Sequence, residues 1–126
     1  MIVDLKKILW VSRHTMTDEQ EKELIDFYGD VQIIQLDETV SDINKIISYN
    51  ADIYAVVLPV DLIAELKNKT NAEIIRPVSE RIKTDIQRIN PATDKYESEY
   101  VFKHIGWQKI IKAEIKTEFL KERLKP

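Results

Sequence analysis

Strand-like and helix-like segments alternate over the first two thirds of this chain, and this alternation is the feature that most constrains its fold. Short apolar runs indicate buried strands, at residues 7–11, 31–36, 53–58 and 72–76. Apolar residues at helical spacing follow each of the first three runs. The run at 53–58 is almost wholly apolar, which is typical of the centre of a parallel sheet. The alternation predicts an α/β fold, with three βα units and a fourth strand in a Rossmann-like parallel sheet.

Capping signals support the expected helices. Thr17 can cap a helix start, and Gln20 lies three residues further on, at the capping-box position. Gly29 provides a stop signal after the apolar residues of that helix. We therefore expect the first helix between Thr17 and Gly29.

The pattern changes in the last third of the chain. Residues 100–105 and 111–117 alternate with the period of two that is typical of strands. Residues 106–107 lie between these runs and predict a turn or a bulge. Residues 81–89 fit either a helix or a polar strand, and we favour the strand because turn-like residues follow at 90–95.

These patterns predict one domain over residues 1–126, because 126 residues correspond to about one domain. We expect a Rossmann-like core over 6–78 and a C-terminal antiparallel β extension over 79–126. The formal net charge of −3 argues against duplex DNA as a partner, since non-specific DNA binding needs a basic face. The absence of cysteine excludes disulfides and thiolate chemistry. No apolar run approaches the roughly 18 residues that span a bilayer, and no signal peptide is evident, so we expect a cytoplasmic protein without a membrane partner.

Polar side chains follow the expected strands, at the edge where open α/β sheets bind ligands. Arg13 and His14 come directly after the first strand. Arginine binds phosphate through a planar fork of donors, and histidine transfers protons near neutral pH. We therefore expect a phosphate-containing ligand and phosphodiester chemistry. Further candidate ligand-binding residues at these strand ends are Ser12, Thr15, Thr39, Pro59, Arg76 and Ser79.

Structural roles compete with these assignments. Thr39 can simply cap the second helix, and Pro59 can simply begin the third. Arg76 fits a solvated edge residue as well as a ligand clamp, and His104 fits packing or surface hydrogen bonding. Only two glycines and two histidines are present, so we expect no dinucleotide or P-loop site, no metal and no cofactor.

The strand end Val11-Ser12-Arg13-His14 and the later segment Val56-Val57-Leu58-Pro59-Val60-Asp61-Leu62 resemble motifs of a known family. This family comprises the small single-domain CRISPR-associated proteins related to CARF domains. The resemblance covers roughly residues 6–79. It implies a Rossmann-like ring nuclease that cleaves a cyclic oligoadenylate second messenger in type III CRISPR antiviral signalling.

The chemistry that the resemblance implies needs no metal, because each RNA linkage carries a neighbouring 2′-hydroxyl that can attack its own phosphodiester. Arg13 would stabilise the charge of the transition state and His14 would transfer protons. A ring with rotational symmetry also implies a homodimer that binds it across a two-fold axis. Two alternatives stay open: a non-catalytic nucleotide sensor that uses the same cleft, and an interaction module that works through an exposed β edge.

Overall fold

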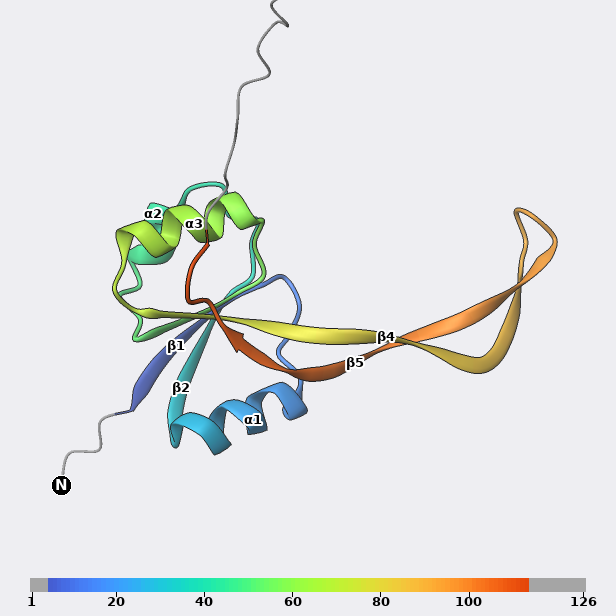
Figure 1. The fold of residues 1–126 in the computed structure, drawn as a ribbon, viewed down its shortest axis with the longest axis horizontal. Helices are drawn as coiled ribbons and strands as arrows, with labels where there is room; N and C mark the ends of the chain where they lie inside the picture. The colour runs from blue at the N-terminus through green and yellow to red at the C-terminus, as the bar shows by residue number, and fades with distance from the viewer. Residues whose placement is uncertain (1–4, 114–126) are drawn as a thin grey trace, which may run out of the picture.

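The computed structural model describes residues 5–113, which form a mixed α/β fold (Figure 1). The sheet strands and the helices alternate over the first part of the chain, and two long strands follow. In chain order the elements are β1 (Lys6–Val11), α1 (Asp18–Tyr28), β2 (Val31–Leu36), α2 (Ile43–Ile47), β3 (Ile53–Val56), α3 (Val60–Lys69), β4 (Glu73–Asn90) and β5 (Lys95–Lys109).

The five strands form one sheet in the order β2-β1-β3-β4-β5. The first four run parallel, and β5 is antiparallel to β4. Consecutive parallel strands cannot be joined by a tight turn, so each connection crosses a face of the sheet through a helix. The expected α/β sheet with an antiparallel C-terminal addition is therefore present.

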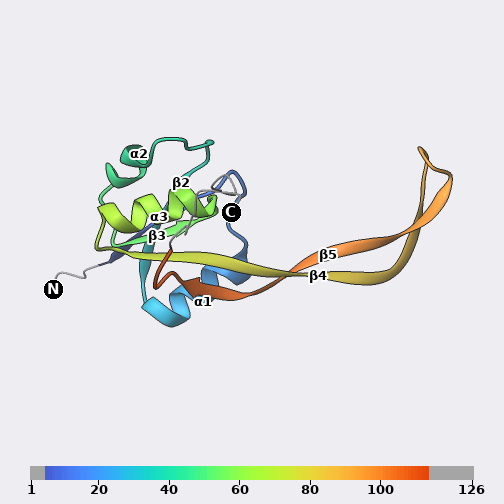
Figure 2. The ribbon, with the colours of Figure 1, turned by 45° about the horizontal axis from the view of Figure 1, so that its top comes forward.

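Helices cover both faces of this sheet (Figure 2). On one face, α2 and α3 bury Ile43, Ile46 and Ile63 against Leu9 of β1 and residues around it. On the other face, α1 packs Leu24 into a second cluster, which contains Ile8, Trp10, Ile53, Ala55 and Ile75. Because helices cover both faces of the sheet, β3 is buried at every position. Its sequence is therefore continuously apolar rather than alternating.

The first helix begins and ends as its sequence predicts. Thr17 accepts a hydrogen bond from the Gln20 amide, and the Gln20 side chain accepts one from the Thr17 amide. Gly29 ends the helix with a φ of 81°, a conformation that favours glycine. The capping box is therefore confirmed.

Strands β4 and β5 form a hairpin that extends far from the rest of the molecule (Figure 1). The strand prediction for residues 81–89 is confirmed, and so is the turn after Asn90, whose carbonyl accepts from Thr93 and Asp94. Residues 106–107 were expected to form a turn or a bulge. Val78 pairs with Gly106 and Ser79 pairs with His104, so β5 has a bulge directly beside Gly106 and continues through it without a turn.

Two expectations for this region are corrected. We expected the fourth strand to end at Arg76, but β4 continues to Asn90 because it pairs with β5 beyond the body of the sheet. We also expected a strand over 111–117, but β5 ends at Lys109 and residues 110–113 are not in a strand. Residues 114–117 lie outside the described residues. Among residues 5–113 no helix combines the length and the apolar character needed to cross a membrane.

Candidate functional site

The carboxyl ends of β1, β2 and β3 border a cavity of about 290 Å³. The Ser12 amide donates to the Leu36 carbonyl of β2, and the Val57 amide donates to the Val11 carbonyl of β1, so the three strand ends lie side by side. Five predicted site residues line this cavity: Ser12, Arg13, His14, Thr39 and Pro59. The other lining residues are Val11, Glu38, Val40, Val57, Leu58 and Leu62.

Hydrogen bonds hold the loop after β1 in place. The Trp10 indole donates to the His14 carbonyl at 2.8 Å. The Gln35 side-chain amide donates to the carbonyls of Ser12 and His14 at 3.0 and 3.1 Å. The His14 amide donates to the Ser12 hydroxyl at 3.1 Å, and Ser12 is buried. The backbone of this loop is therefore fixed from β1, from β2 and from within.

The side chains of Arg13 and His14, in contrast, are exposed and have no hydrogen-bond or ion-pair partner within residues 5–113. A guanidinium that no carboxylate neutralises can bind an incoming anion. The one acidic residue that lines the cavity, Glu38, forms an ion pair with Lys45. The cavity therefore presents the positive charge of Arg13 on a loop whose backbone is held in place by hydrogen bonds.

The N-terminus of α3 adds backbone donors to the same cavity. Pro59 precedes its first turn and makes no side-chain capping hydrogen bond. The first amides of a helix have no partner within the helix and are a ready site for anions, although Asp61 in this turn opposes a negative ligand. Pro59 was expected either to begin the third helix or to line a ligand site. It lies at the start of α3 and also lines the cavity.

Three candidate residues lie elsewhere. Thr15 lines a separate hollow of about 260 Å³ beside Met16 and Gln35. Arg76 and Ser79 were expected at a strand end, but both lie within β4, because this strand continues into the hairpin. The Arg76 guanidinium donates to the Gln108 side chain across the hairpin, which matches its interpretation as an exposed edge residue. The structure does not place these three residues around the main cavity.

The sequence did not point to Gln35 or Trp10 as residues that position the site. Gln35 is one of two glutamines in β2, with Gln32, and the sequence pattern does not distinguish between them. Trp10 is buried in the core beside Trp107, with ring centroids 5.6 Å apart. Its hydrogen bond to His14 follows from the turn of the loop, which the sequence pattern does not reveal.

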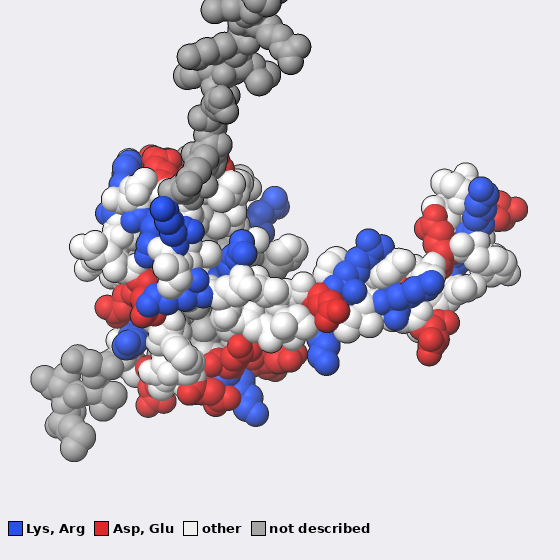
Figure 3. Space-filling model, in the orientation of Figure 1, with Lys and Arg blue, Asp and Glu red and all other residues white. Residues whose placement is uncertain are grey.

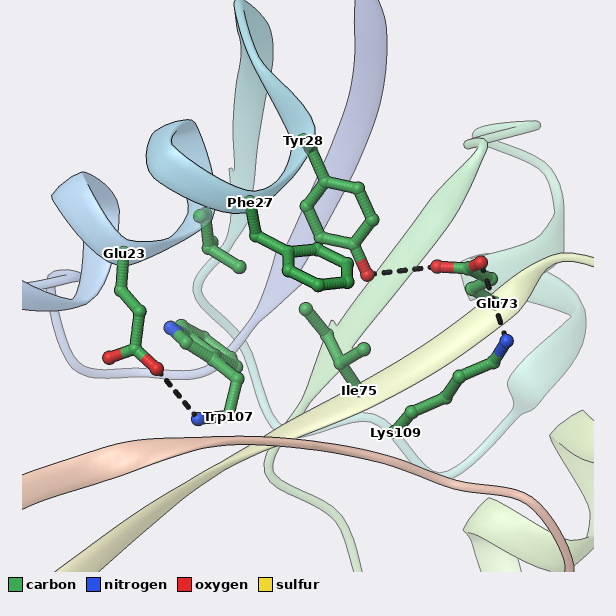
Figure 4. Close-up of a pocket in the computed structure, with 8 residues that line it drawn as sticks. Glu23, Phe27, Tyr28, Glu73, Ile75, Trp107 and Lys109 are labelled. Atoms are coloured by element: carbon green, nitrogen blue, oxygen red, sulfur yellow. Dashed lines mark hydrogen bonds and ion pairs between the residues drawn. The ribbon is translucent and has the colours of Figure 1, made fainter.

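A second cavity, of about 200 Å³, lies between α1 and the inner ends of β4 and β5 (Figure 4). Phe27, Tyr28 and Trp107 supply aromatic walls. Tyr28 donates to Glu73 at 2.8 Å, and Lys109 approaches the same carboxylate at 3.4 Å. The sequence analysis did not predict this cavity, although the adjacent aromatic residues at the end of α1 are a signal for it.

The polar network of the second cavity shifts the pKa values of Tyr28 and Glu73. Burial, followed by the hydrogen bond to Glu73, raises the pKa of Tyr28 well above its ordinary value. The hydrogen bond from Tyr28, with the positive charge of Lys109, lowers the pKa of Glu73 despite partial burial. Both pKa shifts favour a protonated Tyr28 and an ionised Glu73, which are the forms that this hydrogen bond needs. The hydrogen bond and the ion pair with Lys109 together connect α1 to β4 and β5.

His104 has a structural position at the base of the hairpin. Its Nε2 lies 2.8 Å from a Glu23 carboxylate oxygen, and its ring contacts Trp107 edge-on. The other Glu23 oxygen accepts from the Trp107 amide. His104 therefore packs and hydrogen-bonds at the base of the hairpin, in agreement with the interpretation made from the sequence.

Across residues 5–113 no three or more histidine, aspartate or glutamate side chains gather closely enough to hold a metal ion. No protein-family model matches the chain, and no curated protein or solved structure is significantly similar to it.

Proposed function

We propose that the cavity at the ends of β1, β2 and β3 binds a cyclic oligoadenylate and that the protein cleaves it as a metal-independent ring nuclease. One observation carries this proposal: five candidate residues line the same cavity, and three of them lie on a loop that hydrogen bonds hold in place. They are Ser12, Arg13 and His14 on the loop, with Thr39 and Pro59 beside them. In this proposal the core is a Rossmann-like domain of the CARF-related CRISPR-associated kind. The resemblance in residues 11–14 and 56–62 supports that assignment.

The proposed reaction uses a nucleophile that the substrate provides. A ribose 2′-hydroxyl attacks the adjacent phosphorus, the bond to the 5′-oxygen breaks, and the products carry a 2′,3′-cyclic phosphate and a 5′-hydroxyl. Arg13 stabilises the additional negative charge of the transition state, together with backbone amides. His14 transfers the proton of the attacking hydroxyl or protonates the leaving oxygen. Ser12 and Thr39 orient phosphate or ribose hydroxyl groups.

A homodimer completes the proposal. A cyclic oligonucleotide with two-fold symmetry fits a site that two identical subunits share. Each subunit then contributes one Arg13 and one His14 to opposite sides of the ring.

A second candidate function is a non-catalytic receptor for the same ligand. One observation favours it: within residues 5–113 no side chain orients the His14 imidazole by a hydrogen bond. A general acid or base needs to lie within hydrogen-bond reach of its proton, and a second group commonly orients it. A receptor needs only the charge of Arg13 and the loop backbone.

The test is incubation of the purified protein with a panel of cyclic oligoadenylates in excess chelator, followed by separation of the products. We expect cleavage to persist and to yield 2′,3′-cyclic phosphate ends. Arg13→Ala should slow cleavage by about 10²-fold or more, because it removes a charge-assisted contact to the reacting phosphate. Arg76→Ala is the matched control, since Arg76 is an exposed arginine that bonds Gln108 instead of lining the cavity.

His14→Gln separates the two candidate functions. For a nuclease, this variant should bind the ring with nearly unchanged affinity and lose turnover. An analogue with 2′-deoxyriboses should bind without being cut, and cutting of that analogue would exclude the proposed nucleophile. Tight binding of the natural ring without turnover over hours would assign the receptor function, and a lack of binding would reject both.

A further inference from the structure

Residues 79–104 form a two-stranded ribbon that projects from the body of the molecule and presents two different faces (Figures 1 and 2). Side chains alternate between the two faces along each strand, and residues paired across the ribbon share a face. Along β5 the alternation runs from His104 to Tyr96. At the register shift, residues 84–86 of β4 lie opposite Glu99 alone.

The pairing assigns the residues of the ribbon to these faces. One face, which we call the aromatic face, carries Ser79, Arg81, Lys83, Gln87, Ile89, Tyr96, Ser98, Tyr100, Phe102 and His104. The opposite face carries Glu80, Ile82, Arg88, Asn90, Lys95, Glu97, Glu99, Val101 and Lys103.

The two faces differ in charge, although the ribbon as a whole carries both signs (Figure 3). Of the residues assigned to the aromatic face, Arg81 and Lys83 are cationic and none is acidic. The opposite face mixes three cationic residues with three glutamates, and its Arg88 forms an ion pair with Glu99. Only the aromatic face is therefore complementary to a polyanion.

Exposed rings and available cations are neighbours on the aromatic face. Phe102 is 76% exposed, Tyr96 is 71% exposed and Tyr100 is 42% exposed. Tyr100 and Phe102 are two residues apart in β5, so they lie roughly 7 Å apart along the strand. The Arg81 guanidinium stacks on the Tyr100 ring, 3.6 Å from its centre. Neither Arg81 nor Lys83 has an ion-pair partner within residues 5–113, so both can contact an incoming phosphate.

The base of the ribbon is fixed to the body, so the exposed rings are held in a defined position. His104 Nε2 lies 2.8 Å from a Glu23 carboxylate oxygen of α1, and the Trp107 indole donates to the Gln20 carbonyl. Beyond this attachment the rings are exposed. The aromatic face is also separate from the candidate cavity at the ends of β1, β2 and β3, because none of its residues lines that cavity.

We propose that the aromatic face binds single-stranded nucleic acid. Bases stack on Phe102 and Tyr100, and Arg81 and Lys83 contact the phosphates beside them. Exposed rings next to cations are the usual means of binding single strands without reading their sequence. A duplex keeps its bases inside the helix and can use only the cations. The net charge of −3 provides no wider basic surface for a duplex.

The first experiment measures the binding of fluorescein-labelled oligo(dT) and oligo(U), each about 12 nucleotides long, by fluorescence anisotropy. Both should bind, because stacking and phosphate contacts do not need the 2′-hydroxyl. A duplex of the same length should bind at least about tenfold more weakly. Phe102→Ala should raise the dissociation constant about tenfold, since it removes one stacking surface, whereas Phe102→Trp should retain binding. Val101→Ala is the matched control, because Val101 is an exposed apolar neighbour on the opposite face.

The second experiment measures how the dissociation constant depends on salt. Arg81→Ala with Lys83→Ala should reduce the slope of log Kd against log salt concentration by about 1.4, because each lost phosphate contact removes about 0.7. Lys95→Ala with Lys103→Ala removes the same total charge from the opposite face and should leave the slope nearly unchanged. Circular dichroism should show that all variants are folded.

Four results would overturn the proposal. The first is a natural chain that binds neither oligonucleotide at about 100 µM protein in about 50 mM salt. The second is a duplex that binds as tightly as the single strands, which would exclude stacking. The third is Val101→Ala weakening binding as much as Phe102→Ala. The fourth is an equal change of the salt slope in both double variants, which would indicate a general effect of charge instead of a site on one face.

Discussion

Trp10→Phe tests whether the core of the protein holds the candidate site loop. Trp10 is only 3% exposed, and its indole donates to the His14 carbonyl at 2.8 Å. The substitution removes this donor, which contributes about 1 kcal/mol net. It also removes roughly 40 Å² of buried apolar surface, a further loss of about 1 kcal/mol. The His14 carbonyl keeps its bond from Gln35, so no buried acceptor is left unpaired.

The expected decrease in the free energy of unfolding is therefore about 2 kcal/mol, measured by urea denaturation. Loss of the indole donor should also loosen the loop. An opening free energy lower by about 1 kcal/mol corresponds to roughly fivefold faster hydrogen exchange at the His14 amide. NMR-detected exchange of that amide reports the local effect separately from the global one.

Trp107→Phe is the matched control for this prediction. Trp107 makes the other half of the edge-on ring contact, and its indole donates to the Gln20 carbonyl at 3.1 Å, not to the site loop. This variant should also be destabilised, by about 1–2 kcal/mol, but exchange at His14 should stay close to that of the natural protein. The reasoning is refuted if both variants accelerate exchange at His14 equally, or if Trp10→Phe lowers the unfolding free energy by less than about 0.5 kcal/mol.

Three further predictions concern the body of the fold. Tyr28→Phe removes the largest cause of the lowered pKa of Glu73, so the native protein should lose less stability as the pH falls below about 4. A carboxyl group whose pKa is lower in the folded state than in the unfolded state stabilises the fold while it is ionised. This stabilisation is lost when the group is protonated at low pH. Urea denaturation at several pH values measures the free energy of unfolding and its dependence on pH. Gly29→Ala places a side chain at a φ of 81° and should cost about 1–3 kcal/mol in thermal unfolding experiments, whereas an unchanged melting temperature would contradict the assigned helix end. Thr17→Ala removes one bond of the capping box and should lower the unfolding free energy by about 1 kcal/mol, with an increase in fraying of the first turn of α1 visible by NMR.

The parallel part of the fold was predictable because its signals are local and agree with each other. The apolar run at 53–58 indicated a central strand, and β3 covers Ile53–Val56 of that run and is buried at every position. Thr17 and Gly29 marked the two ends of α1, and both act as predicted. Residues 81–89 were ambiguous because their isoleucines fit two periods, and the turn residues after Asn90 correctly favoured the strand.

The predictions from the sequence that were wrong concern the long hairpin of β4 and β5. Arg76 and Ser79 resemble residues after a strand end, because the polar residues that follow are typical of a loop. A strand that leaves the body of the protein has no buried face along most of its length, so it has no apolar alternation to reveal it. Hydrogen bonds to β5, which are distant in sequence, hold this part of β4 in place.

By itself, the sequence determined the alternation of strands and helices, the two ends of α1, and the position of Ser12, Arg13 and His14 directly after a strand. Each of these features depends only on residues that are close together in the sequence. Only the tertiary structure decided which of these polar groups share a cavity. The order β2-β1-β3 brings Thr39 and Pro59 beside Arg13, whereas the extension of β4 carries Arg76 and Ser79 away from it. The physical reason is that strand order and strand length are set by pairing between distant segments, and a local sequence pattern contains no record of that pairing.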